Sequence, residues 1–163
     1  MGTVSQKMEK LKDSDFVKVS INGSGVLGTG VYKVVVASAG GGSSGKSSIF
    51  MSWCDGTRGG YGDVQTKLFI VDSSVNYTAT IGKKGLDGRD GNLCSSGGNG
   101  AAGGSSTFKA GNIVNITTAG GGGGGVSHSG SCDLGVCSNG RNGTDAGIAG
   151  NAGDGYVILY RKK

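Results

Sequence analysis

Residues 82–103 read GKKGLDGRDGNLCSSGGNGAAG, and this stretch decides the fold. A helix of the polyproline-II type has three residues per turn and no internal hydrogen bonds. Glycine at every third position gives such a helix an edge without side chains, so two edges can approach and share backbone hydrogen bonds. We therefore predict packed polyglycine-II helices here rather than flexible loops. The periodic glycines are Gly82, Gly85, Gly88, Gly91, Gly97, Gly100 and Gly103, with Cys94 at the one interrupted position.

The absence of proline supports the same interpretation. The chain has 163 residues, of which 37 are glycine and none is proline, whereas glycine makes up about 7% of an average protein. Proline has no backbone N–H, so an array that needs every donor excludes it, while collagen depends on proline. Two later stretches extend the array: the run Gly120, Gly121, Gly122, Gly123, Gly124 and Gly125, and a looser period that includes Gly147, Gly150 and Gly153.

Short runs of β-branched and aromatic residues separate the glycine tracts and predict strands. Six such runs can enclose one modest core. The predicted fold class is therefore mainly β with irregular structure: a small antiparallel β framework plus a packed bundle of polyglycine-II helices, with almost no α-helix. The six predicted strands are residues 17–21, 31–37, 65–71, 77–81, 113–117 and 156–160.

The N-terminus holds the only helix-like stretch. Val4, Met8 and Leu11 fall on one face of a helix. Because this stripe is too short to be stable alone, residues 1–15 are predicted to form either an N-terminal arm or a short docking helix. Residues 16–163 form the glycine-rich domain.

Charge and hydropathy argue against two classes of partner. The formal net charge is +5, but residues 19–160 hold nine basic and eight acidic side chains. A nucleic-acid surface needs basic residues gathered on one face with aromatic residues among them, so we expect no nucleic-acid binding. The sequence has no apolar run long enough for a membrane span, and we expect no signal peptide because its first twenty residues lack the apolar run of one.

One motif resembles an enzyme site. Residues 40–47, GGGSSGKS, match the phosphate-binding P-loop pattern and follow an apolar run. Lys46 and Ser47 would then contact the phosphates and Mg²⁺ of a nucleotide. The helix that this loop requires could extend only to about Trp53, and no doubly wound sheet fits the spacing of the later elements. We therefore expect a chance match, no enzyme activity and no cofactor.

The four cysteines leave several states open. Cys54, Cys94, Cys132 and Cys137 allow three disulfide pairings, and sequence alone does not choose among them. Cys132 and Cys137 are close enough in sequence to close a small loop. His128 precedes them, but a structural zinc site normally has four ligands in two close pairs, so reduced thiols or a loop disulfide are favoured over a metal.

The order of elements resembles a known family. The stretches VYKVVVASAGGG (31–42), NYTATIGKKGLDGRDG (76–91), NITTAGGGGGG (115–125) and GDGYVILYRKK (153–163) are similar, in this order, to the glycine-rich domain of bacteriophage tail-fibre proteins and tail-tip adhesins. The resemblance covers residues 17–162. It implies a β framework carrying a sandwich of polyglycine-II helices, whose connecting loops bind a host receptor at the tip of a tail fibre.

This resemblance also implies partners and a location. The partners would be a bacterial outer-surface receptor, either protein or glycan, and other tail-fibre subunits, for which fibre symmetry allows a homotrimer. The chain would be made in the host cytoplasm and, as part of the virion, would act outside the cell. It departs from the family in its short length, its four cysteines and the charged residues within its glycine repeat.

Bulky residues that interrupt the glycine tracts are the candidates for receptor contact. Trp, Tyr and Arg are the residue types that most often anchor interfaces. A structural virion decoration or spike protein without a receptor is the main alternative. An ice-binding protein is a lesser one, because charged residues such as Lys83 and Asp87 interrupt the flat face that it needs. The predicted receptor-binding residues are Trp53, Arg58, Tyr61, His128 and Leu134.

Overall fold

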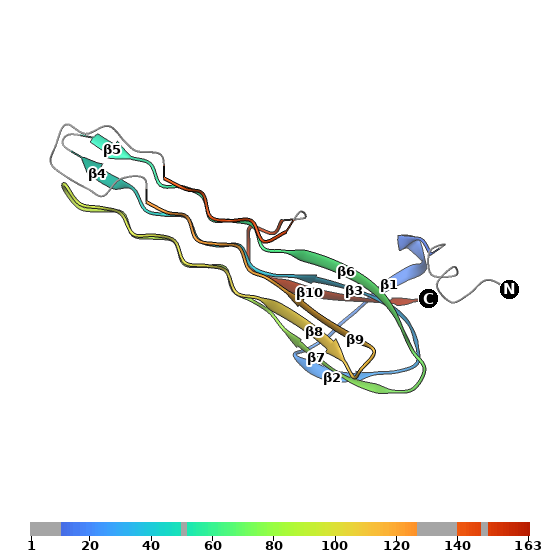
Figure 1. Ribbon diagram of the computed structural model, residues 1–163. Helices are drawn as coiled ribbons and strands as arrows, with labels where there is room; N and C mark the ends of the chain where they lie inside the picture. The colour runs from blue at the N-terminus through green and yellow to red at the C-terminus, as the bar shows by residue number, and fades with distance from the viewer. Residues whose placement is uncertain (1–10, 50–51, 127–139, 148–149) are drawn as a thin grey trace.

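The computed structural model describes residues 11–49, 52–126, 140–147 and 150–163. This part of the chain is mainly β-strand, and its only helical element is a short 3₁₀ turn, η1 (Asp13–Asp15). Figure 1 shows two regions: a group of strands at one end and a bundle of extended, wavy segments that runs from it to the opposite end. We call the strand region the sandwich and the bundle the shaft.

The sandwich consists of two antiparallel four-stranded sheets. Their orders are β1-β10-β3-β6 and β2-β7-β8-β9, and a separate two-stranded hairpin, β4-β5, lies at the far end of the shaft. The strands are β1 (Phe16–Val19), β2 (Ser24–Leu27), β3 (Gly30–Ala37), β4 (Ser47–Ile49), β5 (Ser52–Cys54), β6 (Val64–Val71), β7 (Val75–Thr80), β8 (Ser106–Ala110), β9 (Val114–Thr118) and β10 (Tyr156–Lys162).

The core lies between the two large sheets. Side chains alternate along a strand, so every second residue of β3 and β8 faces inward. Phe108 and Leu159 are fully buried, and the Phe108 ring packs 6.0 Å from the rings of both Phe69 and Tyr77. The rest of the cluster is Leu27, Tyr32, Val34, Val36, Val71, Ala110, Val114 and Ile116.

The structure confirms a mainly β fold with almost no α-helix in the described residues. Each of the six predicted strands is present, although residues 20–21 and 81 lie outside the strands and 113 belongs to a turn. No strand was predicted at β2, β4, β5 or β8. These strands have three to five residues, and each carries only one or two apolar side chains, so none forms a clear run.

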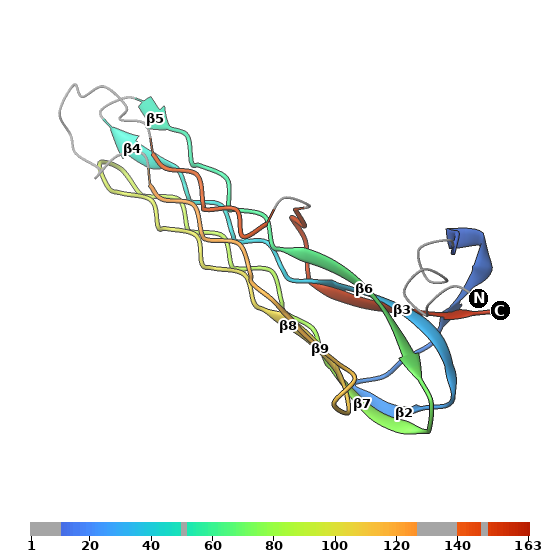
Figure 2. The ribbon, with the colours of Figure 1, turned by 45° about the vertical axis from the view of Figure 1, so that its right-hand side comes forward.

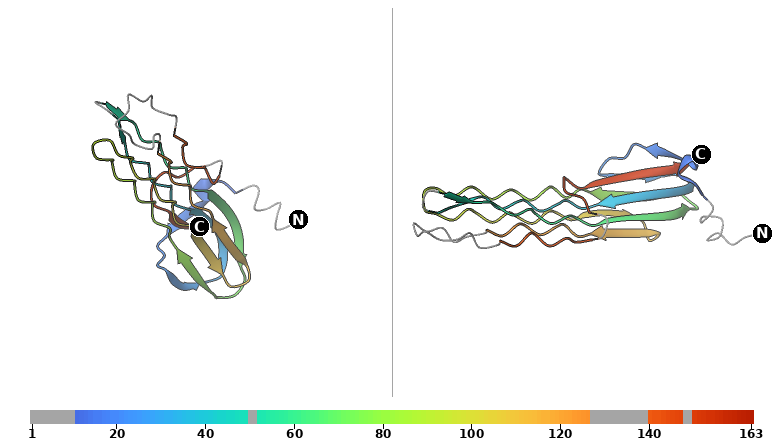
Figure 3. Two further views of the ribbon diagram at one scale, coloured as in Figure 1. Left: turned by 60° about the vertical axis from the view of Figure 1, so that its left-hand side comes forward. Right: turned by 90° about the horizontal axis from the view of Figure 1, so that it is seen from above.

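The chain leaves the sandwich three times and returns each time. It runs out along 38–46 and back along 55–63, out along 81–91 and back along 97–105, and out along 119–126 and back along 140–147. Each of these shaft segments continues directly from a strand or ends close to one. Figure 3 shows them side by side along the length of the shaft.

Backbone hydrogen bonds join the shaft segments with a period of three residues. In segment 38–46, every third N–H group donates to segment 55–63, and the N–H group that follows each of these donates to segment 97–105. Carbonyl groups of the same segment accept from segments 81–91 and 119–126, so 38–46 lies in the middle of the bundle. The donors to 55–63 are Ser38, Gly41 and Ser44, the donors to 97–105 are Ala39, Gly42 and Gly45, and all six N–O distances are 2.8–3.0 Å.

Glycine is required in the shaft because neighbouring backbones approach too closely for a side chain. A Cβ atom at Gly42 would overlap the carbonyl oxygen of Leu86, and one at Gly88 would overlap that of Gly98. A Cβ atom at Gly123 would likewise overlap the carbonyl oxygen of Gly100. Backbone carbonyls that are fixed by hydrogen bonds cannot move aside easily, so these positions exclude even alanine.

A short crossover, residues 151–155, closes the shaft at its base and leads into β10 (Figure 2). Asn151 forms a β-bridge with Gly62, and the carbonyl of Gly153 accepts a 2.9 Å hydrogen bond from the N–H of Gly40. The carboxylate of Asp154 accepts a 2.7 Å hydrogen bond from the N–H of Lys84. The crossover therefore contacts three shaft segments in turn.

The close approach of Gly123 and Gly100 gives a test of the shaft. We expect Gly123→Ala to lower the free energy of unfolding by about 2 kcal/mol, because the added methyl group overpacks against the backbone carbonyl of Gly100. Chemical denaturation of the purified protein measures this change.

Gly125→Ala is the matched control on the same segment. A Cβ atom there would lie 3.5 Å from the carbonyl oxygen of Arg141, which is an ordinary contact. We expect this variant to be as stable as the wild type. Equal destabilisation by both substitutions would contradict the proposed role of close approach.

Candidate functional site

The end of the shaft opposite the sandwich is formed by the β4–β5 hairpin and the turn at 92–96. The N–H of Ser48 donates to the carbonyl of Ser95 over 2.9 Å, and the N–H of Cys94 donates to Ser48 Oγ over 3.1 Å. The N–H of Gly97 donates to Ser47 Oγ over 3.0 Å. These bonds hold the hairpin and the turn together as one surface, which we call the tip.

The tip exposes large apolar side chains. Trp53 on β5 is 53% exposed and Leu93 in the turn is 81% exposed. Ile49 on β4 is buried, whereas Trp53, one of the residues predicted to contact a receptor, lies on the surface. Exposed aromatic and aliphatic side chains on a hydrogen-bonded support are suited to contact another molecule.

Cysteines stabilise the tip. Cys54 and Cys94 are both disulfide-bonded, and Cys54 is fully buried. Cys94 has a φ angle of 58°, in the left-handed region that non-glycine residues rarely adopt. This residue occupies the interrupted position of the three-residue glycine period, so the interruption marks the point where the chain reverses direction.

Arg58 and Tyr61 lie on the side of the shaft rather than at the tip. Arg58 forms a bidentate ion pair with Asp145 of segment 140–147, at 2.9 and 3.2 Å. The N–H of Tyr61 donates to the same carboxylate over 2.9 Å, and the guanidinium carbon of Arg58 lies 4.7 Å from the centre of the Tyr61 ring. The pair therefore joins segments 55–63 and 140–147 as well as leaving two large side chains on the surface.

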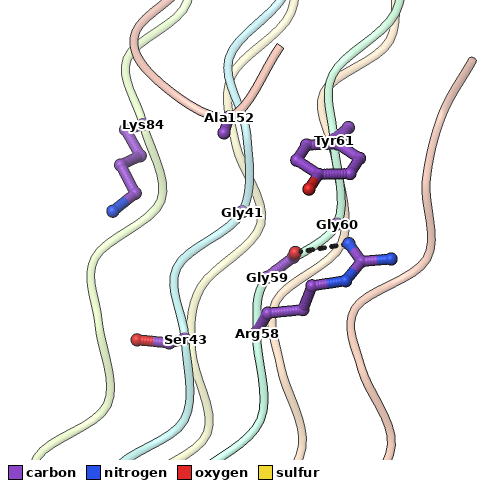
Figure 4. A pocket seen from close by; sticks show the side chains of 8 residues that line it. All are labelled: Gly41, Ser43, Arg58, Gly59, Gly60, Tyr61, Lys84 and Ala152. Carbon is purple, nitrogen blue, oxygen red and sulfur yellow. Dashed lines mark hydrogen bonds between the residues drawn. The ribbon is translucent and has the colours of Figure 1, made fainter. Parts of the chain in front are cut away.

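These residues line one side of a shallow groove of about 230 Å³. Figure 4 shows Arg58 and Tyr61 on one side, Lys84 on the other, and the backbone of Gly41 between them. The Lys84 Nζ is 3.8 Å from the Asp87 carboxylate, beyond hydrogen-bonding distance. The groove thus has a floor of glycine backbone and a positively charged group on each side.

Electrostatic partners shift the pKa values of the carboxyl groups on this surface. The hydrogen bond from Arg58, together with that from the Tyr61 N–H, lowers the pKa of Asp145 below its ordinary value of 3.8. Hydrogen bonds from the N–H and hydroxyl of Ser43 lower the pKa of Asp87 in the same way. Both groups are therefore charged at neutral pH and serve as hydrogen-bond acceptors for backbone N–H groups.

The P-loop match at 40–47 has no free donors for a phosphate group. A P-loop binds phosphate through its backbone N–H groups. Here all seven N–H groups from Gly40 to Lys46 donate within the chain, five to carbonyl oxygens and two to the carboxylates of Asp87 and Asp90. Residues 47–49 continue as a strand and not as the helix that the motif requires.

The structure separates the predicted contact residues. Trp53 lies at the tip, Arg58 and Tyr61 lie on the side of the shaft, and His128, Leu134, Cys132 and Cys137 lie outside the described residues. Leu93 and Asp145 were not among the predicted contact residues. The interrupted glycine period at Cys94 could have indicated a turn with an exposed Leu93, but no sequence signal pairs Asp145 with Arg58.

The ion pair at Arg58 gives a second test. We expect the Asp145 carboxyl group to titrate below pH 3.8 in the wild type and closer to 3.8 in Arg58→Ala, because the variant loses the main stabilising partner of the carboxylate. NMR chemical shifts of the Asp145 side chain measure the titration. The pair stabilises the folded state above the unfolded-state pKa, and this stabilisation is lost as the pH falls through the lower folded-state pKa.

Arg58→Lys is the conservative control for this titration. Lysine keeps the charge but cannot form the bidentate pair, so the pKa of Asp145 should lie between the other two values. A wild-type titration at the ordinary value would contradict the ion pair.

Neither metal ligands, nor a membrane-spanning helix, nor a similar known protein assigns a function to the part of the chain that the structure describes. The described residues contain no group of three or more His, Cys, Asp or Glu side chains that could hold a metal ion. No helix in the described part of the chain is long and apolar enough to cross a lipid bilayer. No family model and no curated protein sequence matches the chain.

Proposed function

We propose that this chain is a virion protein of the bacteriophage tail-fibre or tail-tip adhesin kind, and that its tip binds a receptor on the surface of a bacterial host. One observation carries the proposal: the first two of the out-and-back excursions place the β4–β5 hairpin and the turn at 92–96 together, at the end opposite the sandwich. The receptor is a protein or a glycan of the bacterial outer surface.

We propose further that the shaft segments are polyglycine-II helices. The support is the three-residue period of their inter-segment hydrogen bonds and the close approach of backbones at glycine. Such a helix bonds to several neighbours at once, whereas a strand bonds to two at most. Segment 38–46 bonds to four other segments, which favours the helical interpretation.

A shaft of this kind suits the proposed function because the shaft provides the support and the tip provides the side chains that contact the receptor. The shaft segments are fixed by backbone atoms, so their sequence is constrained to glycine at the contact positions. The tip carries no such constraint, and its side chains are free to match a receptor. Trp53 and Leu93 are the described tip residues most suited to anchor such a contact, and His128 and Leu134 remain sequence-based candidates.

The disulfides favour action outside the cytoplasm. Cys54 and Cys94 are both disulfide-bonded, and such bonds persist in oxidising surroundings such as those outside a cell. Stabilisation by these bonds near an exposed tip is in keeping with a protein that meets the host surface from outside.

The alternatives explain less of the structure. A decoration or spike protein without a receptor would need the shaft but not an exposed Trp53 at its end. An ice-binding face would have to be flat and uncharged, whereas Lys83 and Lys84 project charge from segment 81–91. Attachment to other tail-fibre subunits, with a homotrimer as one arrangement, would involve the sandwich, which lies at the opposite end from the tip.

Binding to cells tests the receptor proposal. We expect the purified, fluorescently labelled protein to bind some strains in a panel of bacteria and to reduce phage adsorption to those strains. Trp53→Ala and Leu93→Ala should each weaken cell binding about tenfold or more, because anchor residues at an interface often contribute upwards of about 1.4 kcal/mol.

Ile113→Ala is the matched control. Ile113 is 41% exposed in the turn between β8 and β9, at the sandwich end of the molecule. Its replacement should leave binding unchanged. Equal binding by all three variants, or no binding to any strain, would favour the structural alternative.

A crystal structure tests the helix assignment. We expect the shaft segments to rise about 3.1 Å per residue with three residues per turn. A rise of about 3.3 Å with side chains alternating between two faces would identify them as β-strands instead.

A further inference from the structure

The crossover occupies only the base of a longer strip of shaft surface. It bonds in turn to segments 55–63, 38–46 and 81–91. These segments continue side by side towards the tip, whereas the crossover turns away into β10 (Figures 1 and 3). We call the surface that the three segments form the track. The groove described above lies in the track beyond the crossover, and Ala152 of the crossover stands at one end of it (Figure 4).

The crossover is held in the track mainly by its backbone. Gly62 and Asn151 exchange two backbone hydrogen bonds, of 2.8 and 3.0 Å, and the N–H of Gly40 donates to the carbonyl of Gly153 over 2.9 Å. A Cβ atom at Gly40 would lie 2.6 Å from the carbonyl oxygen of Ala152, so the two backbones are in direct contact. The base of the track therefore already binds one extended stretch of polypeptide.

One repeat nearer the tip, the track presents two N–H groups without a bonded partner. Hydrogen bonds in the shaft repeat every three residues, so groups three residues apart face the same side. The N–H of Gly62 bonds to the crossover, and that of Gly59 is its equivalent nearer the tip. The N–H of Asp87 is likewise equivalent to that of Lys84, which donates to the Asp154 carboxylate over 2.7 Å. Within the described residues, neither Gly59 nor Asp87 donates its backbone N–H to any acceptor.

A cation with unused donors lies beside these N–H groups. The Lys84 side chain lines the groove, and the Asp87 carboxylate with which it pairs is 3.8 Å away, too far for a hydrogen bond. An ammonium group has three donors. Arg58 on the opposite wall differs, because it already forms its bidentate pair with Asp145. Lys84 is therefore the group of the groove that is best placed to bind a carboxylate from another molecule.

We propose that the groove binds an extended, acidic peptide segment of a second protein, which continues the line of the crossover along the shaft. Main-chain carbonyl groups of that segment accept hydrogen bonds from the N–H groups of Gly59 and Asp87, and a carboxylate side chain pairs with Lys84. The N–H of Ser43 takes no part, because it already donates to the Asp87 carboxylate. The proposal concerns the side of the shaft and does not depend on receptor binding at the tip.

A peptide fits this surface better than a glycan does. Binding of an extended peptide by unpaired main-chain groups is a recurring mode of recognition, in which backbone hydrogen bonds provide affinity and side-chain contacts provide specificity. Here the crossover shows that the same track accepts main-chain atoms at hydrogen-bonding distance. The groove adds one selective contact, the Lys84 ammonium group.

Amide hydrogen exchange in the free protein tests the donors. We expect the N–H of Gly59 to exchange at least tenfold faster than that of Gly60, because a hydrogen bond protects an amide from exchange. The N–H of Gly60 donates to the carbonyl of Gly122 over 2.7 Å and is the matched control. Equal protection of the two glycines would overturn the proposal.

Peptide titration followed by NMR tests the binding. The probe is a synthetic peptide that contains the sequence of residues 150–155, GNAGDG, twice in succession, because this sequence fills the base of the track. We expect the amide signals of Gly59 and Asp87 to shift and saturate, with a Kd of about 1 mM or lower. Lys84→Ala should weaken binding at least fivefold. Lys109→Ala, which removes an exposed lysine of β8 in the sandwich, should leave binding unchanged.

Three results would overturn the proposal. The first is the absence of a saturable shift at Gly59 and Asp87. The second is equal binding by the wild type and Lys84→Ala, or equal binding of a peptide in which asparagine replaces both aspartates. The third is a stronger shift of the Gly59 signal by an oligosaccharide of uronic acids than by the peptide, which would identify the groove as a glycan site.

Discussion

The structure depends on one constraint: the extended shaft segments have no hydrogen bonds within themselves. Each buried N–H and C=O group must then find a partner on another segment or lose the free energy of its bond with water. The shaft meets this requirement by placing neighbours around segment 38–46, and the required close approach excludes side chains at the contact positions. The glycine content and the absence of proline both follow from this requirement.

Side-chain carboxylates accept hydrogen bonds from backbone N–H groups that have no backbone acceptor. Asp87 and Asp90, three residues apart, accept hydrogen bonds from the N–H groups of Ser43 and Lys46 on the open side of the central segment. These two aspartates stand between the periodic glycines, and they supply the acceptors that the N–H groups of the central segment need. Asp145 has the same role at the N–H of Tyr61, and it pairs with Arg58 as well.

Much of this architecture could be predicted from the sequence because periodicity is a local signal. The period of three indicated extended, glycine-edged segments, and the apolar runs identified the strands that supply most of the core. The pairing of Arg58 with Asp145 could not be predicted, because the period does not specify which segments are neighbours or in what register. The exposure of Leu93 also depends on where the chain turns. The interrupted glycine period indicates this position, but it does not specify the geometry of the turn, which includes the positive φ angle of Cys94.

The central position of segment 38–46 has a consequence for folding. It is synthesised early, but its partners include Gly85, Ala101, Gly124 and Gly153, which the ribosome adds much later. Nearly all shaft contacts are therefore distant in sequence, and such topologies fold slowly. We expect the shaft to be complete only after the crossover at 151–155 has left the ribosome, so that a chain truncated before this point would leave the N–H of Gly40 without its partner, the carbonyl of Gly153.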